Sequence, residues 1–314
     1  MRPAVALVAA SLAGVALAAA AAPSDRFTLG VLRRDGIVTP FATFDGKRWH
    51  NDWPKPVGHV DEVPVTLRSV PRWWWGRPGP RETWRAWVGS AAPLELHVTG
   101  AGVYDAQCLQ QIGLRTDYRP SAPPPGPGAR PYPKDGLAAS PDAPIERIDV
   151  LPIPPIETPL ETAFRNAEML AAPGAPAESL QGLFRRKQGI GPLTIEAAYA
   201  AGEVSSRIYY FEVVRRYVRL GPERRGECEG LSYGAGWFRR DGSGPLRSLS
   251  FEVATTTCDR PGALYMLPLG VVRADGRFYW IAQWSGWNTE RYNIVEIEPK
   301  GTEDVLRVLG GGCE

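Results

Sequence analysis

The chain is poor in the residues that enzymes most often use for catalysis or metal binding. Its 314 residues include three histidines, four cysteines and three methionines. No pair of histidines or cysteines has the spacing of a zinc site, and the P-loop, the dinucleotide-binding glycine pattern, HExxH and the calcium loop are all missing. We therefore expect no cofactor and no metal, and we favour a protein that is not an enzyme.

Neither sign of charge dominates the chain. There are 36 Lys and Arg residues against 34 Asp and Glu residues, which gives a formal net charge of +2. Proteins that hold nucleic acid by electrostatic attraction are usually strongly basic. We therefore do not expect a nucleic-acid partner.

A long apolar run occurs only at the N-terminus, in MRPAVALVAASLAGVALAAAAAPSD. One arginine, a run of alanine, valine and leucine, and small residues near Ala18–Ala22 predict a secretory signal peptide over residues 1–22. A membrane anchor is the alternative, but no positively charged stop follows the run, so we favour cleavage. We expect an exported bacterial protein, periplasmic or extracellular, with no transmembrane anchor after cleavage.

Residues 230–257 predict a long hairpin around the turn sequence DGSGP. Folding about Ser243 sets Tyr233 opposite Val253 on one apolar face. A bulge in the glycine-rich part of the first strand would shift this pairing by one residue.

The four cysteines are expected to form disulfides, as is usual in exported proteins. The hairpin places Cys228 opposite Cys258, within the Cα separation that a disulfide needs. By elimination, Cys108 then pairs with Cys313. We consider a metal site the less favoured alternative, because the spacing of the cysteines does not suit one.

The chain is rich in turn-forming residues, with 31 prolines and 34 glycines. Four Asp-Gly dipeptides lie between strand-like runs, and Asp-Gly is typical of tight hairpin turns. Consecutive strands joined by short turns predict an antiparallel meander, and no βαβ rhythm is present. The predicted fold class is all-β, mainly an antiparallel meander, with one or two short helices.

Two distant segments have nearly the same sequence, LGVLRRDG at 29–36 and LGVVRADG at 269–276. Each predicts a hairpin around its Asp-Gly. The similarity of the two segments suggests that the first and last strands lie in equivalent or adjacent places in the fold, as in a closed propeller or barrel. The predicted cross-strand pairs are Leu29–Ala42, Leu32–Thr39, Val271–Trp280 and Val272–Tyr279.

Proline divides the mature chain into regions. Residues 23–118 are an N-terminal β-rich region, and residues 157–314 are a helix followed by a C-terminal antiparallel meander. Between them, residues 119–156 form a proline-rich linker or long loop. Twelve prolines lie between Arg119 and Pro155, so we expect no central strand there.

One helix has a clear start signal. Thr158-Pro159-Leu160-Glu161 matches a capping box with proline at the first helical position. We expect its buried face to contain Leu160, Phe164, Ala167 and Leu170 or Ala171. A shorter second helix is predicted over 179–187.

Two features are tested for enzymatic chemistry. Gly230–Gly234 reads G-x-S-x-G, but the motif needs a following helix, and here a strand and a turn follow. Paired carboxylates could hydrolyse a glycan, and Asp259 and Glu290 are the weak catalytic candidates. Each is more simply interpreted as a turn or surface charge.

Tryptophan is unusually abundant, with 11 residues. Indole faces stack on sugar rings, but tryptophan also fills the cores of large β-folds. The predicted ligand-binding residues are Trp73, Trp74, Trp75, Trp284 and Trp287. We expect a polysaccharide or an envelope protein as partner; a secreted hydrolase of an envelope polymer and a purely structural envelope protein are the alternatives. The oligomeric state stays open.

Overall fold

The computed structural model describes residues 26–54, 65–70, 82–89, 91–106, 108–126, 129, 132–171, 189–219, 222, 226–260, 264–286 and 289–312. The described residues are mostly in antiparallel strands, with one α-helix among them, so the all-β prediction is confirmed. Several predicted features lie outside the described residues: the signal peptide, the helix over 179–187, Trp73, Trp74, Trp75, Trp287 and Cys313.

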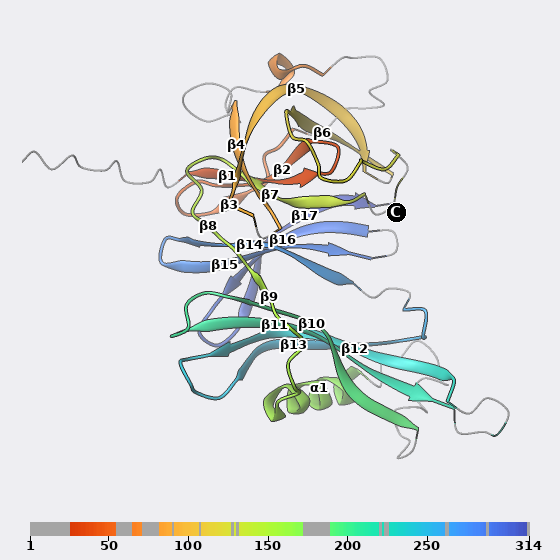
Figure 1. Cartoon of the computed structure of the whole chain (residues 1–314). Coiled ribbons are helices and arrows are strands. Elements are labelled where there is room, and N and C mark those ends of the chain that lie inside the picture. Colours follow the sequence, from red (N-terminus) through yellow and green to blue (C-terminus); the bar gives the residue numbers. More distant parts are fainter. Residues whose placement is uncertain are drawn as a thin grey trace, which may run out of the picture.

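The elements stack in four layers, which we call the barrel, the middle sheet, the outer sheet and the helix layer (Figure 1). The barrel strands, in order, are β1 (Phe27–Arg33), β7 (Lys134–Ala139), β4 (Thr83–Val88), β5 (Leu94–Ala106), β6 (Leu109–Thr116) and β2 (Ile37–Phe44), which pairs again with β1. Strand β3 (Trp49–His50) pairs with β2, and a 3-10 turn spans Leu67–Ser69.

The other two sheets have five strands each. The middle sheet has the order β17 (Thr302–Gly312), β16 (Thr289–Ile297), β15 (Arg277–Ser285), β14 (Tyr265–Ala274) and β8 (Ile145–Glu146). The outer sheet has the order β13 (Arg247–Thr256), β12 (Cys228–Arg240), β11 (Arg207–Val218), β10 (Ile190–Ala201) and β9 (Asp149–Val150). Helix α1 (Thr158–Ala171) covers the far face of the outer sheet (Figure 1).

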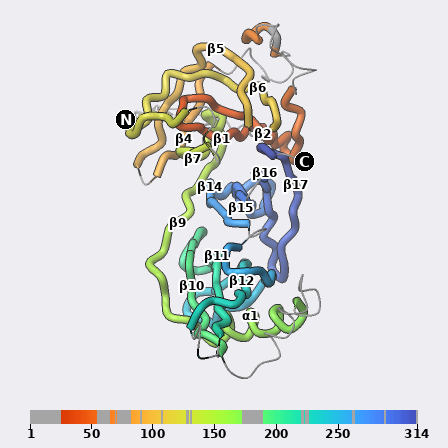
Figure 2. The backbone as a smooth tube through the Cα atoms, turned by 90° about the vertical axis from the view of Figure 1, so that its right-hand side faces the viewer, coloured from red at the N-terminus to blue at the C-terminus, as the bar shows by residue number. Residues whose placement is uncertain are grey.

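The proline-rich stretch contains a central strand, so that expectation is wrong. Strand β7 pairs with β1 on one side and β4 on the other. The physical reason is local: no proline lies between Pro133 and Pro141, so every residue of β7 can donate its backbone N–H. The stretch then crosses the molecule from the barrel to α1 as an extended strap that adds β8 and β9 to the two sheets (Figure 2).

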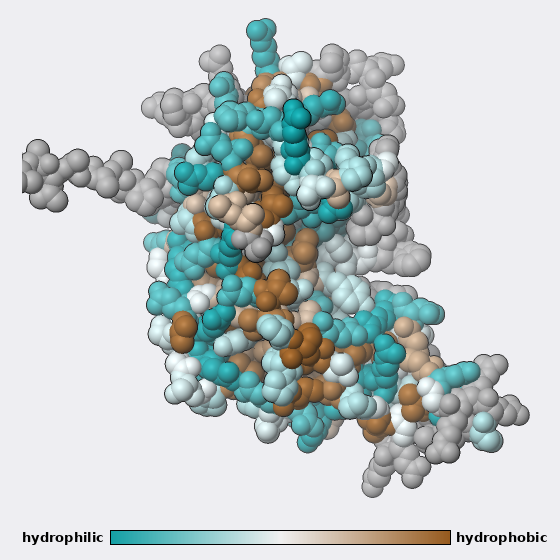
Figure 3. Space-filling view, viewed as in Figure 1, coloured by the Kyte–Doolittle hydropathy of each residue, from teal (hydrophilic) through white to brown (hydrophobic). Residues whose placement is uncertain are grey.

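The strap follows a three-residue period after β9. Leu151, Pro154 and Glu157 are half-buried, whereas the residues between them are exposed. Polyproline II has three residues per turn, so this pattern is typical of that conformation packed along one of its faces. Figure 3 shows hydrophobic surface along the face over which the strap passes. Val150 and Ile153 of the strap are exposed apolar side chains.

Each layer interface has its own apolar core. Trp84 is fully buried inside the barrel, Tyr279 between the barrel and the middle sheet, and Trp280 between the middle and outer sheets. Phe164 of α1 packs on the outer sheet. The molecule therefore has three layer interfaces and the barrel interior to fill, which explains the large number of buried aromatic side chains.

The two Asp-Gly hairpins differ in turn type. Asp275 and Gly276 both have positive φ, as a two-residue type I′ turn requires, and the predicted pairs Val271–Trp280 and Val272–Tyr279 are confirmed. In the β1–β2 hairpin only Gly36 has positive φ, and the loop has three residues. The longer loop shifts the register, so Leu32 lies opposite Val38 and its predicted pairing is wrong.

A bulge in the same hairpin restores the predicted register farther from the turn. The register shifts between Leu29 and Gly30, so Leu29 lies opposite Ala42 as predicted. The β1–β2 and β14–β15 hairpins pack against each other across the interface between the barrel and the middle sheet. The last strand, β17, belongs to the middle sheet, so the barrel closes without it.

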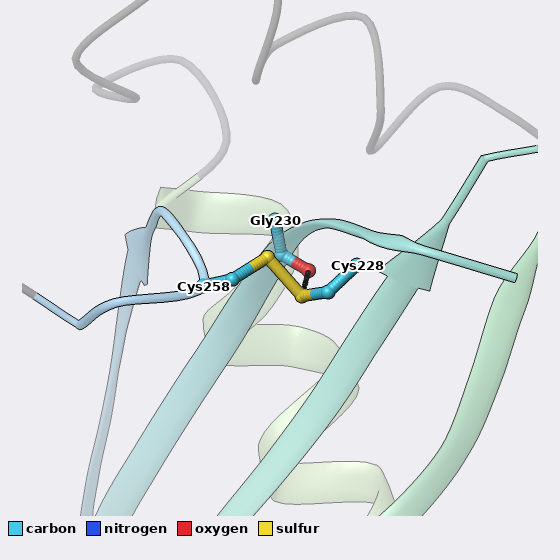
Figure 4. Close-up of a disulfide and its surroundings, with 3 residues drawn as sticks. All are labelled: Cys228, Gly230 and Cys258. Atoms are coloured by element: carbon cyan, nitrogen blue, oxygen red, sulfur yellow. Dashed lines mark hydrogen bonds between the residues drawn. A yellow bond between two sulfur atoms is a disulfide. The ribbon is translucent and has the colours of Figure 1, made fainter. Parts of the chain in front are cut away.

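The predicted disulfide between Cys228 and Cys258 is confirmed, with a Cα–Cα distance of 6.1 Å. It joins the start of β12 to the turn after β13, beside the carbonyl of Gly230 (Figure 4). The β12–β13 register shifts by one at Trp237, so Tyr233 lies opposite Ala254 instead of Val253. Cys108 is disulfide-bonded as well, and its pairing with Cys313 stays a prediction.

Helix α1 begins at Thr158 as predicted, and Leu160 and Phe164 are buried. Leu170 is 83% exposed, whereas its predicted alternative Ala171 is half-buried, as is Ala167. Glu168 takes the next buried position because Arg215 and the Tyr217 hydroxyl bind its carboxylate. The fully buried residues of α1 are therefore Leu160, Phe164 and Glu168, which are spaced four apart.

Candidate functional site

A cleft of about 420 Å³ opens between the middle and outer sheets. We call it the inter-sheet cleft. Its walls come from β11, β12 and β13 on one side and from β15, β16 and β17 on the other. The side chains used below are Tyr210, Tyr233, Trp237, Glu252, Trp284, Arg291, Asn293, Asp304 and Arg307.

Strand alternation places the polar residues of β16 in the cleft. Arg291 and Asn293 line the cleft, whereas Glu290 and Tyr292 point to the opposite face, toward the barrel. Successive residues of a strand face opposite sides of the sheet, so the sequence RYN puts two polar side chains on one face with a buried tyrosine between them on the other.

Three aromatic rings line the cleft as one cluster, which we call the aromatic wall: Tyr210 and Trp237 come from the outer sheet, and Trp284 comes from the middle sheet. The ring centroids of Tyr210 and Trp237 lie 4.9 Å apart, and those of Tyr210 and Trp284 lie 6.0 Å apart. The two indoles are 6.2 Å apart at an interplanar angle of 67°. Edge-to-face contacts of this kind hold the rings in fixed orientations, so the wall is preorganised.

Charged and polar groups of β16 and β17 line the cleft on the middle-sheet side, beside Trp284. Asp304 is ion-paired with Arg307 and accepts a hydrogen bond of 3.2 Å from Asn293 Nδ2. Arg291 lies directly opposite Trp284 in the β15–β16 pair. Partial burial, and the positive charge of Arg307 nearby, lower the pKa of Arg291.

Several buried polar atoms of the cleft lack a hydrogen-bond partner within the described part of the chain. They are Tyr210 Oη, Tyr233 Oη, Trp237 Nε1, Trp284 Nε1, Arg291 Nε and Asn293 Oδ1. Native proteins rarely leave buried polar atoms unpaired, because each loses its hydrogen bonds to water. Other buried polar atoms without a partner lie in the cores, among them Trp84 Nε1 and Tyr279 Oη, but those of the cleft face a space that a polar ligand can enter.

The predicted ligand-binding tryptophans have different outcomes. Trp284 is half-buried and lines the inter-sheet cleft, whereas Trp73, Trp74, Trp75 and Trp287 lie outside the described residues. Among the other described tryptophans, five are buried and Trp87 is half-buried. The core explanation of tryptophan therefore holds for most of those described.

Glu290 is buried between the barrel and the middle sheet. Its carboxylate pairs with Lys134 at 2.8 Å and accepts a hydrogen bond of 2.6 Å from the Tyr292 hydroxyl. The adjoining cavity of about 20 Å³, beside the Arg33 guanidinium and the Tyr104 ring, has room for a water molecule but not for a sugar.

Asp259 lies elsewhere, exposed in the turn after β13 and next to the Cys258 disulfide. The structure therefore places the two candidate carboxylates in separate surroundings, and Glu290 already has its partners. Ser232 of the G-x-S-x-G match is fully buried in the middle of β12, and the strand continues past it.

Sequence reasoning missed Tyr210, Trp237, Arg291 and Asn293. A usable signal was present in β16, where TERYNIVEI puts an arginine and an asparagine on the same face as Val295 and Ile297. Polar residues on an otherwise apolar face are unusual and indicate a polar site. Which strands this face meets depends on the long-range packing of the two sheets.

The chain matches no family model, no curated protein and no solved structure. Among the described helices, none has the length and apolar character needed to cross a membrane. No group of three or more His, Cys, Asp or Glu side chains is arranged to hold a metal ion in the described part of the chain. The geometry of the inter-sheet cleft is therefore the basis for a functional proposal.

Proposed function

We propose that this protein is an exported, non-catalytic binding protein that holds a glycan in the inter-sheet cleft. The observation that carries the proposal is the combination of a fixed aromatic wall with unpartnered buried polar atoms in one cleft. Sugar rings offer apolar faces that stack on indoles, and hydroxyls that pair with polar side chains. The volume of about 420 Å³ lies in the range of small-ligand sites.

A binding role is favoured over hydrolysis by the state of the cleft carboxylates. Asp304 is ion-paired with Arg307 and accepts a hydrogen bond from Asn293, so its carboxylate already has partners. Glu252 is exposed at the rim. Glycoside hydrolysis needs one carboxyl group that stays protonated near neutral pH, which usually requires burial or a neighbouring negative charge.

Export is supported by two observations. The N-terminal sequence has the pattern of a signal peptide, and the three cysteines that the structure describes are disulfide-bonded instead of free thiols. Disulfides persist mainly in oxidising compartments outside the cytoplasm. An envelope polysaccharide is the glycan that a protein in this location would meet.

A retention assay tests the proposal. Mature oxidised protein is incubated with insoluble peptidoglycan, chitin and pectate, and the bound fraction is measured for wild type and Trp284→Ala. Trp87→Ala is the matched control, because Trp87 is also half-buried but packs between the barrel and the middle sheet. We expect Trp284→Ala to lose about tenfold or more in affinity and Trp87→Ala to bind like wild type.

Three outcomes would contradict the proposal. Wild type could fail to bind any matrix, or Trp284→Ala could bind unchanged. Loss of binding only in a variant with Trp73, Trp74 and Trp75 changed to alanine would move the site to that stretch. Release of soluble sugar from a matrix would favour the hydrolase alternative, and circular dichroism shows whether each variant is folded.

A further inference from the structure

The free hydrogen-bonding groups of the inter-sheet cleft are mostly donors. The two indole N–H groups and Arg291 Nε–H can only donate, and the hydroxyls of Tyr210 and Tyr233 can donate or accept. Asn293 Oδ1 is the one group among the six that can only accept. A ligand that satisfies this set must offer several acceptor oxygens.

Arg291 also lacks an ion-pair partner: no carboxylate within the described part of the chain forms an ion pair with it. The acidic side chains that act on its charge are Asp304 and Glu252. Asp304 is bound by Arg307 and Asn293, and Glu252 lies exposed at the rim.

A second opening between the same sheets provides a comparison. It has a volume of about 520 Å³ and contains three arginines. Each of them is paired: Arg239 with Asp241, Arg273 with Glu146, and Arg277 with Glu296. A partly buried guanidinium normally has an anionic partner, so the unpaired state of Arg291 indicates that its partner is a ligand.

The position of Arg291 fits recognition of an acidic sugar. It is the direct cross-strand neighbour of Trp284, which is the half-buried indole of the cleft. A hexuronate bears its carboxylate at the edge of the pyranose ring. Stacking of the ring on the aromatic wall would present that carboxylate to the planar guanidinium, which can bind it with two hydrogen bonds.

We infer that the ligand of the inter-sheet cleft is a carboxylated glycan and that Arg291 binds its carboxylate. This inference rests on the proposed function, since it names the class of glycan for the same cleft. Trp284 and Trp237 supply the ring contacts and additional N–H donors, and Asn293 offers an acceptor for a sugar hydroxyl.

The test uses isothermal titration calorimetry with two probes that differ in whether their carboxyl groups are free or esterified, trigalacturonate and its fully methyl-esterified form. Wild type, Arg291→Gln and the control Arg273→Gln, from the second opening, are titrated with each. We expect wild type and Arg273→Gln to bind the acid about 10- to 100-fold more tightly than the ester. Arg291→Gln is expected to lose that preference and to bind the ester like wild type.

The outcomes separate the two proposals. Equal binding of acid and ester by wild type would overturn the carboxylate inference and leave the glycan-binding proposal standing. A preserved acid preference in Arg291→Gln would overturn the role of Arg291. If wild type bound neither probe but was retained on chitin, the inference would fail alone; if no matrix retained it either, both would fail.

Discussion

Lys134 of the barrel and Glu290 of the middle sheet form an ion pair of 2.8 Å in which each side chain is only 5% exposed. We predict that Lys134→Met costs about 3–5 kcal/mol of unfolding free energy, because it leaves a buried carboxylate without its counter-charge. The double variant Lys134→Met with Glu290→Gln should recover most of this loss. Urea unfolding followed by circular dichroism measures both, and equal losses in the single and double variants would contradict the prediction.

Glu212 is buried in the outer sheet and accepts a hydrogen bond of 2.9 Å from the Met266 backbone N–H. Burial raises its pKa. The folded state therefore holds the proton to higher pH than the unfolded state, so this group's contribution to stability is present at low pH and is lost as pH rises through the folded pKa.

Glu212→Gln should accordingly be more stable than wild type at pH 7 and close to wild type at pH 4. The gain is about 1.4 kcal/mol for each unit by which the folded pKa exceeds the unfolded one. Thermal unfolding at several pH values measures it, and Glu303→Gln, an exposed change on β17, is the control. A difference that shrinks as pH rises would have the wrong sign for this account.

The Cys228–Cys258 disulfide closes a loop of sequence separation 30. Replacing both cysteines by alanine should lower the unfolding free energy by about 3–4 kcal/mol, mainly because the unfolded chain gains freedom. Chemical denaturation of the oxidised proteins gives the difference. A loss below about 1 kcal/mol would show that this end of the hairpin is held by other contacts.

Gly136 allows β7 to approach β4 closely inside the barrel. A Cβ atom built at this position would lie 1.9 Å from the Trp87 carbonyl oxygen, so Gly136→Ala must displace the strand. We predict a loss of at least 2–3 kcal/mol, as for other steric conflicts in a packed core. Gly100→Ala on β5 is the matched control, because a Cβ there meets nothing within 4 Å. Equal stability of the two variants would contradict the observed β4–β7 pairing.

Local patterns predicted the local structure well. Asp275-Gly276 set the β14–β15 register, and the capping sequence set the start of α1. The β1–β2 register was missed near its turn because Asp-Gly also fits a three-residue loop, and the sequence does not choose between the two turns. Strand β7 was missed because the count of prolines over a long stretch concealed the short proline-free window after Pro133.

The site was harder to predict because it forms between sheets. Trp284 was singled out as a ring beside a turn, but its partners Tyr210 and Trp237 come from the outer sheet. The packing of two sheets is a long-range property that strand periodicity does not encode. Glu290 was interpreted most simply as a turn or surface charge, and that interpretation is wrong because the side chain is buried in an ion pair with Lys134.

The central claim is that a glycan enters the inter-sheet cleft, and the indole N–H signals of a ¹⁵N-labelled sample test it most directly. Signals assigned by single Trp→Phe variants are followed during titration with trigalacturonate and, separately, chitotriose. The account predicts that the signals of Trp237 and Trp284 shift with at least one probe, while those of Trp49 and Trp84, buried in and under the barrel, stay in place. Saturable binding of a probe that moves neither cleft signal, or that moves only the barrel signals, would contradict it.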